Sequence, residues 1–307
     1  MNKKLLLLVV VFSLFRLNAA EREKITLHGE WNLFLDAKNQ HNLNVNSVVF
    51  DDVIQLPASL DEARKGNKAE LSNSTHRMLR KYSYYGKAWY SKDIEIPASW
   101  KNKEIELTIE RSRPSHVWID GKYVGNNNII SAPQKYRLTE FLPKGKHRIC
   151  VMVDNGADCG LPAEIASSHM WSDDTQTNWN GLLGEIFISA KNNVFINRFE
   201  TRPNIDSKSV IFDLYIDNFS NKEQEYTILV KSAGREGDNS YQEKSQSFPL
   251  SLKKGSGKYQ LEFSLGNDAS LWSEYSPALY DLSIELQRKG KSFDQIETSI
   301  GLREFKI

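Results

Sequence analysis

The sequence predicts an all-β protein built from two β-sandwiches, and three observations lead to this fold class. Hydrophobic and polar residues alternate with a period of two in many short segments, which is the pattern of strands with one buried face. Polar turns rich in Asn, Ser, Gly and Lys separate these segments, and no long stretch follows the 3.6-residue period of a helix. The length of 307 residues suits about two domains.

The N-terminal segment is expected to lie outside the fold. Lys3 and Lys4 precede an apolar run over residues 5–15, and small residues follow up to Ala20. This order is typical of a secretory signal peptide, which we place at residues 1–20. The apolar run is shorter than the roughly 20 residues that a membrane-spanning helix needs. We therefore expect a periplasmic or extracellular protein without a transmembrane segment.

The first sandwich is predicted to span residues 21–191. Apolar and charged residues alternate over 105–110, which predicts a half-buried strand. Asp120-Gly121 separates two short apolar segments, and this dipeptide favours the two-residue turn of a β-hairpin. A further alternating set covers 149–153, and the apolar run 186–190 closes the series.

The second sandwich is predicted to span residues 192–307, after a polar connector at residues 191–193. Its clearest strand patterns lie at residues 210–217, 226–231, 259–265 and 280–286. About 110 residues with strands at this spacing match the size of an immunoglobulin-like sandwich.

Composition excludes several classes of function. The chain has 40 Lys plus Arg against 39 Asp plus Glu, which gives no electrostatic reason to bind nucleic acid or an anionic membrane. Its two cysteines are too few for a four-thiolate zinc site. In a secreted protein, Cys150 and Cys159 either form a disulfide or remain free thiols, and the sequence leaves both arrangements open.

Motifs spread along the whole mature chain carry a family resemblance. They are Gly29–Asp36, Leu56–Ser59, Tyr85–Tyr90, Val117–Gly121, Val153–Asn155, Asn178–Gly184, Leu271–Ser273 and Gly301–Phe305. Their order resembles the opening of a family 2 glycoside hydrolase, the family of β-galactosidases, β-glucuronidases and β-mannosidases. In that family a jelly-roll (galactose-binding-like) sugar-binding domain precedes an immunoglobulin-like sandwich and a catalytic TIM barrel. The resemblance therefore implies these first two domains here.

The catalytic part of the family pattern is absent from this sequence. Four residues follow Arg303, whereas a (β/α)8 barrel needs about 250. Retention of configuration requires two carboxyl groups about 5 Å apart, and the family's acid glutamate follows an asparagine, but no Asn-Glu dipeptide occurs here. Glu104, Glu106 and Glu110 occupy the polar positions of a predicted strand and are read as solvated. We expect no catalytic residue, no cofactor and no metal ion in this chain.

Residues 169–180 concentrate amides, carboxylates and two indoles. Sugars offer hydroxyls to polar groups and an apolar C–H face to aromatic rings, so this composition suits a carbohydrate. In family 2 enzymes the corresponding loop reaches toward the barrel pocket. The resemblance implies the polar contacts Asp173, Asp174 and Asn178 and the stacking contact Trp171. The competing interpretation is structural, with Trp179 in the core and Asn180 bonded to its own backbone in a turn.

A second aromatic segment precedes the strand predicted near residue 90. Aromatic residues on strands usually pack into a core, so Trp89 and Tyr90 are interpreted as packing residues. Tyr84 and Tyr85 stand just ahead of Gly86, where they can form the rim of a sugar site.

Three functions remain open at this point. In the first, the chain is the non-catalytic sugar-binding and scaffold portion of a secreted, β-galactosidase-like family 2 enzyme of carbohydrate metabolism. In the second, it is a subunit or truncated part of an active β-glycosidase that hydrolyses O-glycosyl bonds, with the barrel on another chain. In the third, it is a structural interaction module without sugar affinity. The second function predicts an apolar docking surface on the later sandwich or around Trp171.

Overall fold

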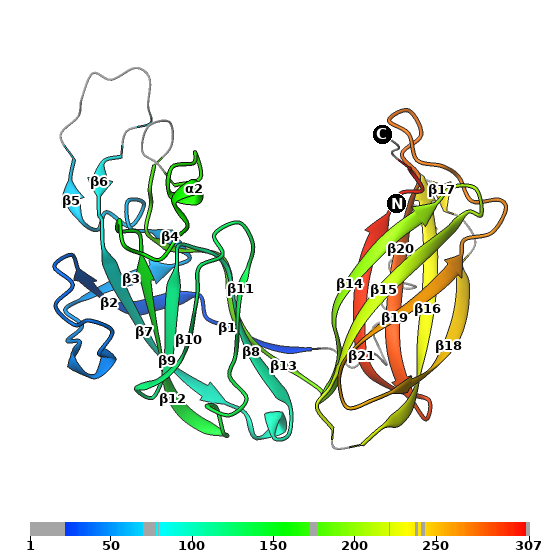
Figure 1. The fold of residues 1–307 in the computed structure, drawn as a ribbon, viewed down its shortest axis with the longest axis horizontal. Coiled ribbons are helices and arrows are strands. Elements are labelled where there is room, and N and C mark those ends of the chain that lie inside the picture. The colour runs from blue at the N-terminus through cyan, green and yellow to red at the C-terminus, as the bar shows by residue number, and fades with distance from the viewer. Residues whose placement is uncertain are drawn as a thin grey trace, which may run out of the picture. The chain divides into compact units, whose positions relative to one another are not determined.

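The computed structural model describes residues 22–69, 78, 80–171, 177–220, 222–236, 239–240 and 243–304, so the predicted signal peptide lies outside the described residues. The described chain forms two units, one of residues 23–190 and one of Arg22 with residues 191–304 (Figure 1). Both units consist of packed antiparallel sheets, and the all-β fold class is confirmed.

The first unit is a jelly-roll sandwich of two principal sheets. One sheet has the order β10 (Lys122–Asn127), β9 (Ser115–Ile119), β12 (Gly145–Asp154), β7 (Lys87–Ile96), β2 (Gly29–Asp36) and β3 (Asp52–Leu56). The other has the order β1 (Glu23–Thr26), β13 (Gly181–Lys191), β8 (Glu104–Ser112) and β11 (Gln134–Arg137), with β4 (Ala58–Ser59) paired to β13. The minor elements are the β5 (Asn67–Lys68) and β6 (Tyr82–Ser83) pair, η1 (Val45–Ser47), η2 (Ala98–Trp100) and α2 (Ala163–Ala166).

The alternation seen in the sequence places the core of this unit. Leu107 and Val117 point into the space between the two sheets and are fully buried, as are their neighbours at alternate positions. Asp120 and Gly121 join β9 to β10 with φ angles of 50° and 77°, which a two-residue hairpin turn requires, so the predicted hairpin is confirmed. The two sheets therefore meet over one apolar layer.

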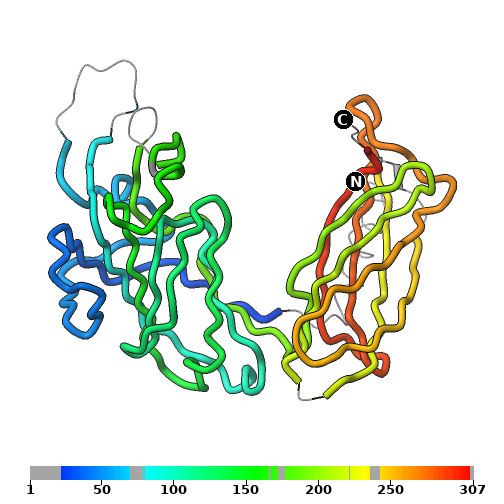
Figure 2. Tube along the Cα trace, in the orientation of Figure 1, coloured from blue at the N-terminus to red at the C-terminus, as the bar shows by residue number. Residues whose placement is uncertain are grey.

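The opposite face of the six-stranded sheet carries a smaller apolar cluster. Trp89 and Trp118 pack there with their ring centroids 5.1 Å apart, beside Cys150 and Met152. The long segment 37–51 between β2 and β3, dark blue in Figure 2, packs against this cluster through apolar side chains that include Phe50. Trp89 and Tyr90 are both fully buried, as expected of packing residues.

The second unit is an immunoglobulin-like sandwich. Its smaller sheet has the order β14 (Val194–Asn204), β15 (Ser209–Asn218) and β19 (Gly255–Ser264). Its larger sheet has the order β17 (Asn239–Ser240), β16 (Gln224–Glu236), β20 (Leu279–Arg288) and β21 (Lys291–Ile300), with β18 (Lys244–Leu252) also paired to β16. All four strand patterns expected after residue 192 correspond to strands of these sheets.

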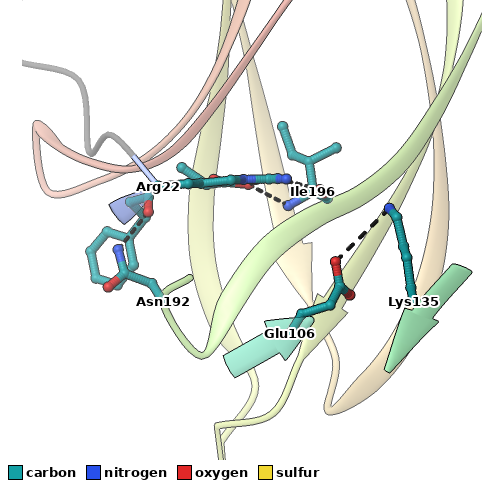
Figure 3. Close-up of polar contacts among 7 residues, drawn as sticks. Arg22, Glu106, Lys135, Asn192 and Ile196 are labelled. Atoms are coloured by element: carbon teal, nitrogen blue, oxygen red, sulfur yellow. Dashed lines mark hydrogen bonds and ion pairs between the residues drawn. The ribbon is translucent and has the colours of Figure 1, made fainter. Parts of the chain in front are cut away.

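One residue from the N-terminal side of the chain belongs to this second unit. The Arg22 guanidinium donates to both carboxylate oxygens of Asp294, at 2.9 and 2.7 Å, and to the Ile196 carbonyl at 2.6 Å. The Asp294 side chain is 2% exposed and also accepts the Ile196 backbone N–H at 2.8 Å. Figure 3 shows Arg22 reaching toward Ile196, with Asn192 beside it. A buried carboxylate on β21 is thus satisfied by β14 and by Arg22.

Candidate functional site

Three buried amide side chains organise one end of the first unit. Asn155 donates to the carbonyls of Tyr84 and Asn178, at 2.8 and 2.9 Å, and its own carbonyl accepts the Asn178 amide. Asn180 donates to the carbonyls of Gly86 and Val153 at 3.1 Å, and its side-chain oxygen accepts the Tyr90 hydroxyl. These amides join three chain segments that are distant in sequence.

The amide network fixes the short segment that carries the two predicted rim tyrosines. The Gly86 N–H donates to the Asn155 side chain at 3.0 Å, and Gly86 has a φ angle of 121°, which side chains rarely tolerate. Tyr84 is buried, and its hydroxyl donates to the Lys87 carbonyl at 2.5 Å. Burial raises the pKa of Tyr84, so its hydroxyl stays protonated. Tyr84 therefore anchors the segment from inside, whereas Tyr85 is 50% exposed.

Arg113 fastens the segments that flank residues 172–176. Its guanidinium lies between two indoles, 4.8 Å from the ring centroid of Trp171 and 4.6 Å from that of Trp179. It donates to the carbonyls of Met170 at 2.6 Å, Trp179 at 3.2 Å and Thr177 at 3.5 Å. Planar stacking and a fork of donors are properties that lysine does not share.

The electrostatics of Arg113 follow from its burial. The side chain is almost inaccessible, and desolvation lowers its pKa to about 10. Among the described residues no carboxylate forms an ion pair with it, so backbone carbonyls and indole rings carry the stabilisation of this charge. At neutral pH Arg113 remains a cation inside the protein.

Arg80 connects the amide network to the exposed tyrosine. It donates to the Asn178 carbonyl at 2.7 Å and to the Tyr85 hydroxyl at 2.6 Å, and its guanidinium lies 5.0 Å from the Tyr85 ring centroid. Tyr85 is thus a surface aromatic ring held in place by a cation, and Arg80 links it to the backbone of Asn178.

The structure brings four of the six predicted sugar contacts to this end of the unit. Trp171, Asn178 and Tyr84 are 7%, 5% and 6% exposed, so their surfaces contact protein. Tyr85 is the exposed member of the set. Asp173 and Asp174 lie outside the described residues. Sugar contact by all six residues stays a prediction.

Sequence reasoning missed the residues that hold this site together. Arg113 falls in the short gap between two strands, where a charge looks solvated, and the sequence offers no sign of its indole partners. Asn155 was recognised only as part of the Val153–Asn155 family motif, yet its side chain is 1% exposed and serves the amide network. Asn180 bonds distant segments, not the local backbone that the structural interpretation had assigned to it.

The cysteines, any metal-binding groups and any membrane-spanning helix are the remaining features to place within the described part of the chain. Cys150 and Cys159 are both free thiols there, and burial raises the pKa of Cys150 to about 12. Among the residues with described positions, no group of three or more His, Cys, Asp or Glu side chains is arranged to hold a metal ion. No helix within the described ranges is long and apolar enough to cross a membrane.

Comparison with known families decides the classification. Residues 25–188 match the sugar binding domain of glycosyl hydrolases family 2, and residues 194–303 match a second domain of glycosyl hydrolases family 2. The chain belongs to glycosyl hydrolase family 2. The resemblance inferred from the sequence motifs is confirmed.

Curated members of the family share low sequence identity with the chain. A β-galactosidase of Halalkalibacterium halodurans is 21% identical over 224 residues, which cover 71% of this chain and 20% of the relative. A β-glucuronidase of Formosa agariphila is 21% identical over 313 residues, which cover 94% of this chain and 30% of the relative. The chain therefore spans a fifth to a third of the length of these relatives.

Solved family 2 structures share the fold. A β-glucuronidase from glycoside hydrolase family 2 superposes with a TM-score of 0.70 at 18% identity, covering 94% of this chain and 31% of that protein. A β-galactosidase-like protein from Bacteroides fragilis gives 0.69 at 16% identity, covering 93% of this chain and 42% of that protein. The two sandwiches thus have the fold of the corresponding parts of much longer proteins.

Proposed function

We propose that this chain is the sugar-binding and scaffold portion of a secreted family 2 glycoside hydrolase that acts in carbohydrate metabolism, without catalytic groups of its own. The observation that carries the proposal is the match of two consecutive family 2 domains to residues 25–188 and 194–303. Secretion to the periplasm or the extracellular space is proposed from the signal-peptide pattern of residues 1–20.

The proposed sugar contact lies at Tyr85 and the loop segment beside it. The Tyr85 ring is half exposed, which allows an apolar sugar face to stack on it. Arg80 fixes the tyrosine hydroxyl and the Asn178 carbonyl, so little side-chain freedom is lost when a ligand binds. Arg113 holds the backbone carbonyls of Met170, Thr177 and Trp179.

This proposal is tested by calorimetry with two simple glycosides, methyl β-galactoside and methyl β-glucuronide. We expect weak binding of at least one of them, and we expect Tyr85→Ala to reduce that binding by about tenfold, because the stacking ring is lost. Tyr275→Ala is the matched control, since Tyr275 is 93% exposed and belongs to the other unit. Turnover of p-nitrophenyl β-glycosides by the purified chain would refute a non-catalytic role.

A second function is favoured by one surface of the later sandwich. Leu271 and Tyr275 expose 47% and 93% of their surfaces on the loop that precedes β20. This loop contacts the last described residues: the Trp272 N–H donates to the Leu302 carbonyl at 3.0 Å, and the Arg303 guanidinium lies 4.8 Å from the Trp272 ring centroid. Such an apolar surface suits docking of a catalytic barrel that is carried on another polypeptide.

The native mass separates these two functions. An immunoblot of the secreted protein that gives a band well above 35.2 kDa supports a scaffold within one longer enzyme. A band near 35.2 kDa together with a stoichiometric barrel protein, lost on Leu271→Asp, supports the separately encoded arrangement. Absence of both sugar binding and a barrel partner would leave the interaction module.

A further inference from the structure

A second group of aromatic and polar side chains lies on the outer face of the six-stranded sheet and is centred on its edge strand β10. The Tyr123 ring on edge strand β10 packs 5.3 Å from the Trp118 ring and 5.9 Å from the His116 ring, measured between centroids. Tyr123 is nevertheless 48% exposed. The ring is therefore supported from beneath and open to solvent above.

Polar groups surround this ring on the same face. The Tyr123 hydroxyl is 3.0 Å from His116 Nδ1 and 3.4 Å from the Asn126 side-chain oxygen. Lys87 and Asp154 are cross-strand partners on β7 and β12, and both lie close enough to His116 to act on its charge. We name His116, Tyr123, Asn126, Lys87 and Asp154 the β10 platform.

The neighbouring segment 37–51 borders the platform and leaves it uncovered. Its residue Asn46 lies against the hairpin turn at Gly121, where an added Cβ would meet the Asn46 side-chain oxygen at 2.5 Å. Its residue Asn39 accepts a hydrogen bond from the Lys87 ammonium at 2.6 Å. The platform is thus bounded by the segment on one side and by the exposed edge strand on the other.

We propose that the β10 platform is a second carbohydrate-binding surface, which takes a neutral oligosaccharide. A supported tyrosine ring offers the apolar stacking plane, and the ammonium, carboxylate and amide around it offer directional partners for hydroxyls. The single positive charge of Lys87 is matched by the single negative charge of Asp154, which favours a neutral ligand over an acidic one. This surface centres on Tyr123, whereas the site in the proposed function centres on Tyr85, and Lys87 lies two positions after Tyr85 in the chain.

The neutral form of His116 completes this set of partners. Burial lowers the pKa of His116, and the Lys87 charge lowers it further. When Nδ1–H donates to the Tyr123 oxygen, Tyr123 donates to Asn126 and Nε2 remains an acceptor. Within the described part of the chain only Nδ1 of this ring has a hydrogen-bond partner, and the proposal assigns Nε2 as the acceptor for a sugar hydroxyl.

The test measures binding of β-1,4-linked galactotetraose to the full chain by calorimetry. We expect Tyr123→Ala to weaken binding by about tenfold, Lys87→Met to weaken it about threefold, and Tyr123→Phe to retain most of it, because the ring remains. The control variant Tyr275→Ala keeps the platform intact, and Tyr85→Ala tests whether the tetraose binds at the Tyr85 site instead. Circular dichroism of each variant confirms that the fold survives.

The outcomes distinguish this proposal from the proposed function. Loss of tetraose binding in Tyr123→Ala with retention in Tyr85→Ala supports the platform. Loss in Tyr85→Ala alone overturns it and leaves the Tyr85 site standing. Absence of tetraose binding by the unmodified chain also overturns it, while the Tyr85 site is still judged by its own glycosides. Tighter binding of a galacturonate tetramer would overturn the assignment to a neutral ligand.

Discussion

Replacing Asp294 by alanine is expected to destabilise the second unit selectively. The substitution removes three hydrogen-bond interactions: two from Arg22 and one from the Ile196 N–H. An unpaired buried N–H costs about 1–3 kcal/mol. The Arg22 side chain is 24% exposed and regains water, which reduces its share of the loss. We expect a decrease of about 3 kcal/mol in the free energy of unfolding.

A double-mutant cycle isolates the ion pair. Arg22→Ala leaves the Asp294 carboxylate, 2% exposed, with the Ile196 N–H as its remaining donor among the described residues, so this substitution should also cost about 3 kcal/mol. The double variant should cost about 4 kcal/mol, which gives a coupling energy of about 2 kcal/mol. The control cycle uses Asp93 and Arg148, an ion pair with side chains 70% and 62% exposed, for which we expect about 0.5 kcal/mol or less.

The assay has to report on the second unit alone. Trp272 is the one tryptophan after residue 190 in the sequence, so fluorescence mostly follows the first unit. Hydrogen exchange of peptides from β14 and β21, read by mass spectrometry, measures the local free energy of opening. A coupling energy as small as that of the control pair would refute the reasoning that burial makes this ion pair matter.

Three further predictions concern the first unit. Arg113→Lys should lower the free energy of unfolding by about 2 kcal/mol, because a lysine cannot bond several carbonyls at once or stack on the indoles. The control Arg111→Lys, at an exposed position, should change this free energy little, and equal effects of the two substitutions in urea denaturation would contradict the prediction. Both cysteines should react as free thiols in the unfolded protein, and a mass that corresponds to one intramolecular disulfide would contradict this. In the folded protein Cys159 should react with a thiol reagent before Cys150, because burial raises the pKa of Cys150 to about 12. The pKa of His116 is lowered on folding, so the unfolded chain binds the proton before the folded chain as the pH falls through about 6.5. The free energy of unfolding should therefore decrease over this pH range. In thermal melts at pH 7.5 and 5.5, His116→Gln should show a smaller loss of stability between the two pH values.

Local patterns made the fold predictable from sequence. The Asp120-Gly121 turn was predictable because the two residues themselves determine its φ angles. Trp89 was predictable as a packing residue because aromatic side chains on strands usually pack into a core. Each of these inferences needs a window of a few residues.

The candidate site depends on contacts between residues that are far apart in the sequence. Arg113 meets Met170 and Trp179, which lie 57 and 66 positions away, and Asn180 meets Tyr90 at a separation of 90. In the sequence, a cation or amide that is buried cannot be distinguished from a solvated one, because its hydrogen-bond partners are not known. The sequence therefore named four candidate contacts that lie at one end of the first unit, but not the side chains that support them there.

The division of the chain has a consequence for engineering. Arg22 and Lys191 both belong to the second unit, and everything between them forms the first unit. The two ends of that inserted part, Glu23 and Ala190, face each other as partners in the β1–β13 ladder. Cross-strand partners lie about 5 Å apart, close to the ~3.8 Å between consecutive Cα atoms. The first unit is thus an insertion whose ends are neighbours. One glycine in place of residues 23–190 would connect Arg22 to Lys191, and another domain with neighbouring termini could be inserted at the same position.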